Sequence, residues 1–224
     1  EYTIFRNLNK LAVTYVNILP KKETSLHCHP SKTTGFIILN GSAKVQIGIG
    51  EANAKVYKPS SSLMIRPGLF HSLKNVSKGP LVALEFETPA DKKDLVRFKD
   101  LYGRKLKPYE GQNKTQLGDS LIFFKKPTKN KSRKYLFNNM EILLENYTNY
   151  QKIFKGNNST IIAIIDGKIV NNEGKQVIGY GEIVKPHVLK KLSSSFKIHK
   201  NLILMKVTNK KANNHRKNTL VEIN

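Results

Sequence analysis

Short apolar runs separated by turn signals account for most of the patterning along the first half of the chain. They cover residues 11–18, 34–39, 43–47, 63–65 and 81–88. The breaks between them carry the Gly, Pro, Asn and Ser residues that are typical of turns. Strands at this spacing, with no intervening helical period, predict an all-β sandwich or barrel.

One segment has helical character. Asp91 stands where a helix cap is expected, because a carboxylate there accepts the free backbone N–H groups of a first turn. Apolar side chains follow at mixed spacing as far as Leu101. We therefore expect a helix over residues 91–101 and strands almost everywhere else.

The pattern of the first half recurs in the second. Residues 159–170 can be laid over residues 33–44, because each has a Thr, a five-residue apolar strand, an Asn-Gly or Asp-Gly turn and a second strand. Two barrels of related design explain this most economically. The expected parts are an N-terminal barrel over 1–110, a basic, solvated connector over 111–135, a C-terminal barrel over 136–208, and a charged tail over 209–224 in which residues 220–223 form a short closing strand.

The charge of the chain is strongly positive. Its 224 residues include 39 Lys and Arg against 16 Asp and Glu, a formal net charge of +23. Such an excess is compatible with binding to nucleic acid. The lysines are nevertheless spread along the whole chain, and no aromatic-and-basic module is present. Lys and Asn enriched together are typical of an AT-rich genome, so we expect no nucleic-acid partner.

Other compositional features bear on the compartment. The single cysteine, Cys28, excludes an intrachain disulfide and favours a reducing environment. No apolar run approaches the roughly 20 residues that cross a bilayer. The first residues lack the basic segment and apolar stretch of a signal peptide. We expect a cytoplasmic protein with no membrane partner.

Three histidines carry the candidate chemistry. His27 and His29 are one residue apart, so on a strand their rings point to the same face. His71 follows the Pro67-Gly68 turn and would converge on them if the strands close into a barrel. Three imidazoles that face one cavity are the outline of a metal site.

At these residues the chain resembles the cupin superfamily. The family's first motif has His-x-His, then Glu after four residues, then Gly, and His27, His29 and Gly41 match it. Thr34 occupies the Glu position, and Lys21 occupies that of a leading glycine.

The family's second motif also has a counterpart. Gly68, His71 and Asn75 match it, while the proline is displaced by one to Pro67 and Ser60 stands at the leading glycine. The resemblance implies a small double-sheet β-barrel (the double-stranded β-helix, or jelly roll) with a metal inside near one end. The tandem repeat would make the chain a bicupin whose second barrel is degenerate.

The resemblance also implies the ligands. His27, His29 and His71 would hold a divalent metal; we expect zinc, with iron, nickel or manganese as alternatives. Thr34 is a poor ligand in place of Glu, which leaves the site one negative charge short. Three histidines with open positions still suffice for Zn²⁺. The alternative is a vestigial cavity in which the histidines hydrogen-bond one another and water.

Further groups flank the motifs. Glu85 and Glu87 share one face of the strand that follows His71, and Glu85 is our candidate for proton transfer. The alternative places both carboxylates on the outer face, paired with lysines. Arg66 and Lys32 are candidates for gripping an anionic substrate such as a sugar phosphate.

The second half lacks these ligands. Counted back from Gly167, the two His positions fall on Ile153 and Lys155, and the Glu position falls on Thr160. We expect a metal-free barrel that serves a structural role or forms an interface, and a homodimer.

The closest functional resemblance is to sugar-phosphate isomerase-like cupins. We expect a metal-binding cupin that acts as an isomerase or epimerase on a sugar phosphate or related carbohydrate. A three-histidine iron dioxygenase and a non-catalytic binding or sensing module are the alternatives, because fold alone does not settle function.

Overall fold

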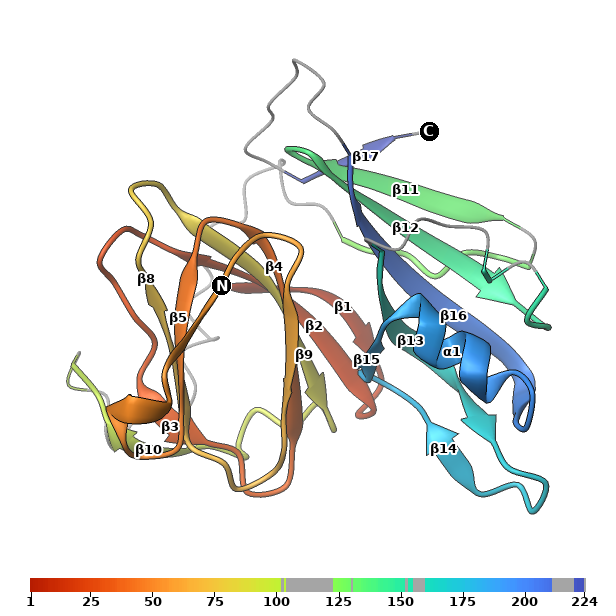
Figure 1. The fold of residues 1–224 in the computed structure, drawn as a ribbon, viewed down its shortest axis with the longest axis horizontal. Coiled ribbons are helices and arrows are strands. Elements are labelled where there is room, and N and C mark those ends of the chain that lie inside the picture. The colour runs from red at the N-terminus through yellow and green to blue at the C-terminus, as the bar shows by residue number, and fades with distance from the viewer. Residues whose placement is uncertain are drawn as a thin grey trace. The chain divides into compact units, whose positions relative to one another are not determined.

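The computed structural model describes residues 1–101, 103, 123–129, 131–151, 153–154, 160–210 and 220–223. The chain divides into two compact units, residues 1–120 and 121–224 (Figure 1). In the described residues, nearly all the regular secondary structure of both units is antiparallel strand, so the all-β prediction is confirmed.

Two five-stranded sheets build the first unit. The first sheet has the order β1 (Tyr2–Asn7), β2 (Leu11–Ile18), β9 (Leu81–Thr88), β4 (Thr33–Asn40) and β7 (Ser62–Ile65). The second has the order β10 (Val96–Lys99), β3 (Leu26–Cys28), β8 (His71–Asn75), β5 (Ala43–Ile47) and β6 (Lys55–Tyr57). One short 3-10 helix, η1 (Glu51–Asn53), lies between β5 and β6.

The two sheets share one apolar core. Side chains alternate along each strand, so every second residue points inward. The inward residues of this core are Val16, Ile18, Phe36, Ile38, Ala43, Val45, Ile65, Leu73, Leu81 and Ala83. Because they come from both sheets, the unit is a double-sheet barrel of the predicted kind, and the five predicted strands are observed to within one residue of their expected ends.

The helix expected over residues 91–101 is wrong. Residues 96–99 form β10, in which Val96 pairs with Cys28, and residues 91–95 are turn and irregular chain. The Asp91 carboxylate does accept a backbone N–H, that of Lys93 at 2.9 Å, but it caps a turn. Strand pairing with a distant segment has overridden the local helical pattern.

The strands described in the second unit lie in one sheet. Its order is β14 (Gln176–Ile178), β13 (Ile161–Val170), β16 (Lys197–Asn209), β12 (Met140–Tyr147), β11 (Ser132–Phe137) and β17 (Val221–Ile223), with β15 (Ile183–Val184) also paired to β13. Helix α1 (Pro186–Leu192) buries Leu189 against this sheet. No helix in the described residues is long and apolar enough to span a membrane.

The predicted boundaries and the strands differ in places. β11 begins at Ser132, inside the segment expected as a connector, because its residues pair with β12. The closing strand expected near the C-terminus is β17, which pairs with β11. Residues 111–122 of the expected connector and 211–219 of the expected tail lie outside the described residues.

The two matched Asn/Asp-Gly pairs behave differently. Asn40-Gly41 is a turn, with Gly41 at φ 75°, after which the chain passes from the first sheet to the second. Asp166-Gly167 instead lies within the continuous strand β13, beside two register shifts. A Cβ on Gly167 would meet the Asn201 carbonyl oxygen at 2.1 Å, so glycine is required there by a bulge. The turn expected at this site is therefore wrong, and a second cupin barrel stays a prediction.

Candidate metal centre

The second sheet brings the three histidines together. His27 on β3 lies directly opposite His71, the first residue of β8. His29 follows the end of β3, and its carbonyl oxygen accepts the Gly68 backbone N–H at 2.7 Å. This bond fixes the Pro67-Gly68 turn beside His29. The turn thereby brings His71 to the other two histidines, as the sequence pattern predicted.

The imidazoles form one compact cluster. One nitrogen from each ring lies within 4.8 Å of the others. Ring centroids are separated by 4.6 Å for His27 and His71, 5.0 Å for His27 and His29, and 5.5 Å for His29 and His71. Within the described residues this is the one group of three or more His, Cys, Asp or Glu side chains close enough to share an ion.

Backbone carbonyls fix the protonation of all three rings. The Nδ1 atoms lie 2.8 Å from the Ser25 oxygen for His27, 2.5 Å from the Asp94 oxygen for His29 and 3.0 Å from the Leu69 oxygen for His71. Because a carbonyl only accepts, each Nδ1 must carry the proton and donate. In the neutral ring the lone pair is then on Nε2, the arrangement found in metal-ligating histidines.

Burial keeps these rings neutral. It lowers the pKa of His27 and His29 to about 4 and that of His71 to about 3, with neighbouring imidazoles and the Lys32 ammonium adding to the effect. The Nε2 atom of His71 is buried without a hydrogen-bond partner in the described part of the chain. Three neutral rings, one with an orphaned acceptor, fit a divalent metal.

Thr34 lies on the inner face of β4. Its side chain is buried, and its hydroxyl has no hydrogen-bond partner among the described residues. Directly opposite on β9 is Glu87, also buried. A carboxylate is therefore present beside Thr34, but it comes from the neighbouring strand.

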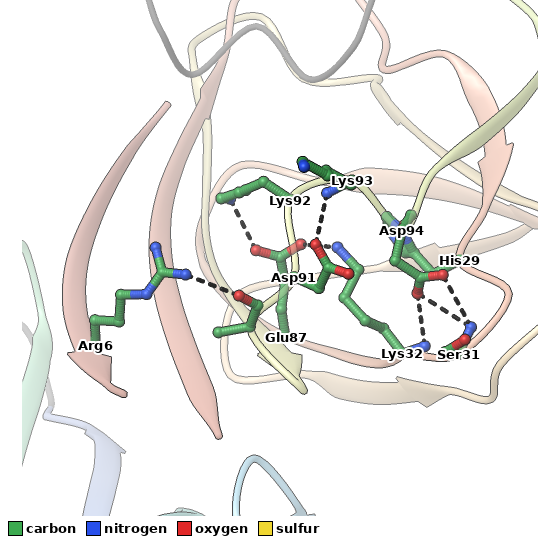
Figure 2. A network of polar contacts seen from close by, with 10 residues as sticks. Arg6, His29, Ser31, Lys32, Glu87, Asp91, Lys92, Lys93 and Asp94 are labelled. Atoms are coloured by element: carbon green, nitrogen blue, oxygen red, sulfur yellow. Dashed lines mark hydrogen bonds and ion pairs between the residues drawn. The ribbon is translucent and has the colours of Figure 1, made fainter. Parts of the chain in front are cut away.

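Two ammonium groups form ion pairs with the Glu87 carboxylate. Lys32 Nζ lies 2.6 Å from one oxygen and Lys92 Nζ lies 2.8 Å from the other, as Figure 2 shows. Burial alone would raise the pKa of Glu87, but Lys92 and Lys32 hold it below its usual range. Glu87 is thus ionised and fully engaged. Lys32, a predicted substrate group, is buried in this ion pair, whereas Arg66 is exposed on the turn beside Gly68.

Glu85 is the second carboxyl group on the inner face of β9. Its neighbours on that face, Ala83 and Leu81, belong to the core, so the inward alternative holds for both glutamates. Burial, and then the charge of Glu87, raises the pKa of Glu85 well above its usual range. The raised pKa favours the neutral form of Glu85 beside the ionised Glu87, a division of roles typical of paired carboxyl groups.

Asp94 is a site residue that the sequence analysis missed. Its carbonyl oxygen accepts the His29 Nδ1–H, and its carboxylate accepts the backbone N–H of Ser31 at 3.1 Å and of Lys32 at 2.8 Å (Figure 2). One residue thus holds both the ring of His29 and the chain that follows it. Nothing local marks this role, because the partners are more than 60 residues apart.

The second unit offers no such cluster in its described residues. Ile153, at one expected His position, is buried in the core, and Thr160, at the Glu position, bonds the Thr208 hydroxyl at 2.9 Å. Lys155, the other expected position, lies outside the described residues.

Comparison with known proteins agrees with this geometry. Residues 14–87 match the family described as "Cupin domain". The chain is similar to the mannose-1-phosphate guanylyltransferase of Escherichia coli (29% identical, 43% of this chain and 20% of that protein). It is also similar to the xanthan biosynthesis protein XanB of Xanthomonas campestris (30% identical, 42% of this chain and 20% of that protein). The match spans only about a fifth of the length of these relatives.

Solved structures with a similar fold include two bacterial proteins. One is a Klebsiella pneumoniae protein with a double-stranded β-helix domain, at a TM-score of 0.38 and 19% identity, covering 42% of this chain and 78% of that chain. The other is TT1209 of Thermus thermophilus, at a TM-score of 0.36 and 19% identity, covering 39% and 80%.

Proposed function

We propose that this chain, which belongs to the cupin superfamily through residues 14–87, binds a divalent metal and acts on a sugar phosphate or related carbohydrate. One observation carries the metal. Three imidazoles, two buried and that of His27 half-buried, meet with Nδ1 bonded to carbonyls, so that their Nε2 atoms carry the acceptor lone pairs. Zinc is the proposed metal, because three neutral histidines with open positions suit it.

The metal would supply one chemical element, the polarisation of a carbonyl or enediolate oxygen of the ligand. The protein would supply the proton from Glu85 on the inner face of β9, where burial and then the charge of Glu87 raise its pKa and so favour the protonated form. Arg66 is the proposed contact for the phosphate, because it is exposed on the turn joined to His29. Lys32 contributes positive charge at the site while its ammonium stays paired with Glu87.

The choice of a carbohydrate rests on the relatives and on these groups. The similar curated proteins are named for mannose 1-phosphate and for xanthan biosynthesis. A proton donor next to a metal is what an isomerase or epimerase needs to move a proton between carbon and oxygen. An isomerase or epimerase is therefore the proposed reaction class.

Elemental analysis tests the metal. Wild-type protein purified without added metal is compared with His71→Ala and with the control His187→Ala, which changes an exposed histidine in α1. We expect stoichiometric metal in wild type and control, and loss in His71→Ala. The same trace metal in all three would contradict the metal site.

The reaction is tested separately, with the metal-loaded protein. Proton NMR of aldose phosphates in D₂O detects isomerisation or epimerisation by exchange at the carbon beside the carbonyl. Exchange that is lost in Glu85→Gln supports the proposal. Bound iron with oxygen consumption would instead favour the dioxygenase, and ligand binding without exchange would favour a binding module.

A further inference from the structure

Two hydroxyl groups on the inner face of the first sheet have no hydrogen-bond partner among the described residues. Thr14 on β2 is 2% exposed and Thr34 on β4 is 1% exposed. The Oγ1 atom of each is buried without a hydrogen bond in the described part of the chain. Burying a hydroxyl in this state costs free energy, which a partner would recover.

Strand register places these threonines in one polar patch. Thr14 lies opposite Glu85 and Thr34 lies opposite Glu87, so the threonines flank the two inward glutamates of β9 from either side. Farther along the same faces the side chains are apolar core residues. The polar patch is therefore confined to the end of the barrel that carries the histidines.

The patch adjoins the candidate metal centre. The Phe36 ring, next to Glu85 across the sheet, has its centroid 6.4 Å from that of His71. Lys32, whose ammonium pairs with Glu87, is held at its backbone N–H by Asp94, the residue that also bonds His29. The threonines thus lie on the sheet that faces the histidines across the barrel.

We propose that Thr14 and Thr34 form a subsite in which each hydroxyl bonds a different uncharged hydroxyl or carbonyl group of one carbohydrate, because the two side chains lie on either side of β9 and are offset by two residues along it. The subsite rests on the proposed function for the identity of its ligand. Threonine hydroxyls both donate and accept, which suits a sugar hydroxyl. A phosphate is disfavoured at the threonines themselves, because the ammonium groups of Lys32 and Lys92 nearby are already paired with Glu87.

Isosteric valine variants test the subsite. Thr14→Val and Thr34→Val keep the volume of the side chain and remove the unpartnered oxygen. In ligand-free protein we expect each to raise the melting temperature by about 2–4 °C, because a buried unpaired polar atom is lost. The control Thr160→Val breaks the 2.9 Å bond to Thr208 in the second unit and should lower it.

Binding is then measured by calorimetry on zinc-loaded protein with mannose, mannose 1-phosphate and inorganic phosphate. Each valine variant should bind the two sugars about two- to tenfold more weakly, the loss of one hydrogen bond. Zinc and inorganic phosphate should bind as in wild type. Thr160→Val should match wild type with all the probes.

Several outcomes would overturn the subsite. It fails if the valine variants bind both sugars as wild type does, if phosphate binding falls equally, or if they melt below wild type. It also fails if the wild type binds zinc but neither sugar. Failure of the proposed function is distinguishable, because the wild type itself would then bind no zinc or neither sugar, whereas failure of the subsite alone leaves both bound by the wild type and bound equally by the valine variants.

Discussion

Replacing Asp94 by alanine should weaken metal binding although no proposed ligand is altered. The substitution leaves the carbonyl that accepts from His29 in place and removes the carboxylate that holds Ser31 and Lys32. Without that clamp, the segment carrying the carbonyl is free to move away from the imidazole. Asp94 is therefore a positioning residue for His29.

The contacts set the size of the effect. Hydrogen bonds to a charged acceptor contribute about 1.5–3 kcal/mol each. The Ser31 contact is exposed to solvent and the Lys32 contact is part-buried, so we expect a loss of about 2–3 kcal/mol in unfolding free energy. Loss of a group that orients a metal-ligating histidine typically lowers metal affinity by about 10–100-fold.

The assay is zinc affinity at neutral pH by competition with a chelating dye, with the Co²⁺ absorption spectrum as a report on ligand geometry. Asp91→Ala is the matched control, because its exposed carboxylate accepts only the Lys93 N–H among the contacts described. Asp94→Asn, which keeps one acceptor oxygen, should be intermediate. Amide exchange at Ser31 and Lys32 reports release of the clamp. Faster exchange with unchanged zinc affinity and spectrum would refute the reasoning.

Four further predictions concern stability. Lys32→Met should cost about 3–5 kcal/mol in urea unfolding because it leaves the buried Glu87 short of a partner, and Lys32→Met with Glu87→Leu should recover most of it; a double variant no better than the single contradicts this. The raised pKa of Glu85 means that its contribution to the free energy of unfolding is full below about pH 4.5 and is lost as pH rises through the folded pKa. Glu85→Gln should therefore remove this decline in stability when urea unfolding is measured from about pH 5 to 8. The lowered pKa values of the three histidines mean that their contribution to the free energy of unfolding is full above pH 6.5 and is lost as pH falls toward about 4 and then 3. His71→Asn should therefore reduce the loss of stability at acid pH, whereas the control His187→Asn should not. Lys21 is held at φ 63°, so Lys21→Gly should raise the free energy of unfolding by about 1 kcal/mol. A lower melting temperature in the variant would contradict the left-handed backbone at this residue.

The sequence predicted the first unit well because its pattern is local. The alternation of a strand and the residues of a turn can be recognised within about ten positions of sequence, and the observed strands follow them. Even the departures from the motif keep its geometry. Lys21 and Ser60, where the resemblance expects glycines, both adopt the left-handed backbone at φ 63° and 67° that glycine accepts at least cost.

Features that depend on distant pairing escaped prediction. The 91–101 segment has a helical pattern, yet Val96 pairs with Cys28 and Asp94 reaches across to His29. The Asp166-Gly167 pair has the signature of a turn, yet the neighbouring strand β16 keeps it within a continuous ladder as a bulge. In both, the energy of a long-range ladder decides between local alternatives that the sequence alone leaves equal.

The charge of the candidate centre also depends on residues that are distant in the sequence. From the sequence, Thr34 in place of a carboxylate leaves the site one negative charge short. The structure supplies Glu87 across the strand, but Lys32 and Lys92 bring two positive charges to its one, so this group has a net charge of +1. With the three imidazoles held neutral by their lowered pKa values, the proposed ligands in the described part of the chain bring no negative charge to a divalent ion held there. Its open positions would therefore favour an anionic oxygen, hydroxide or an oxyanion of the ligand, over neutral water.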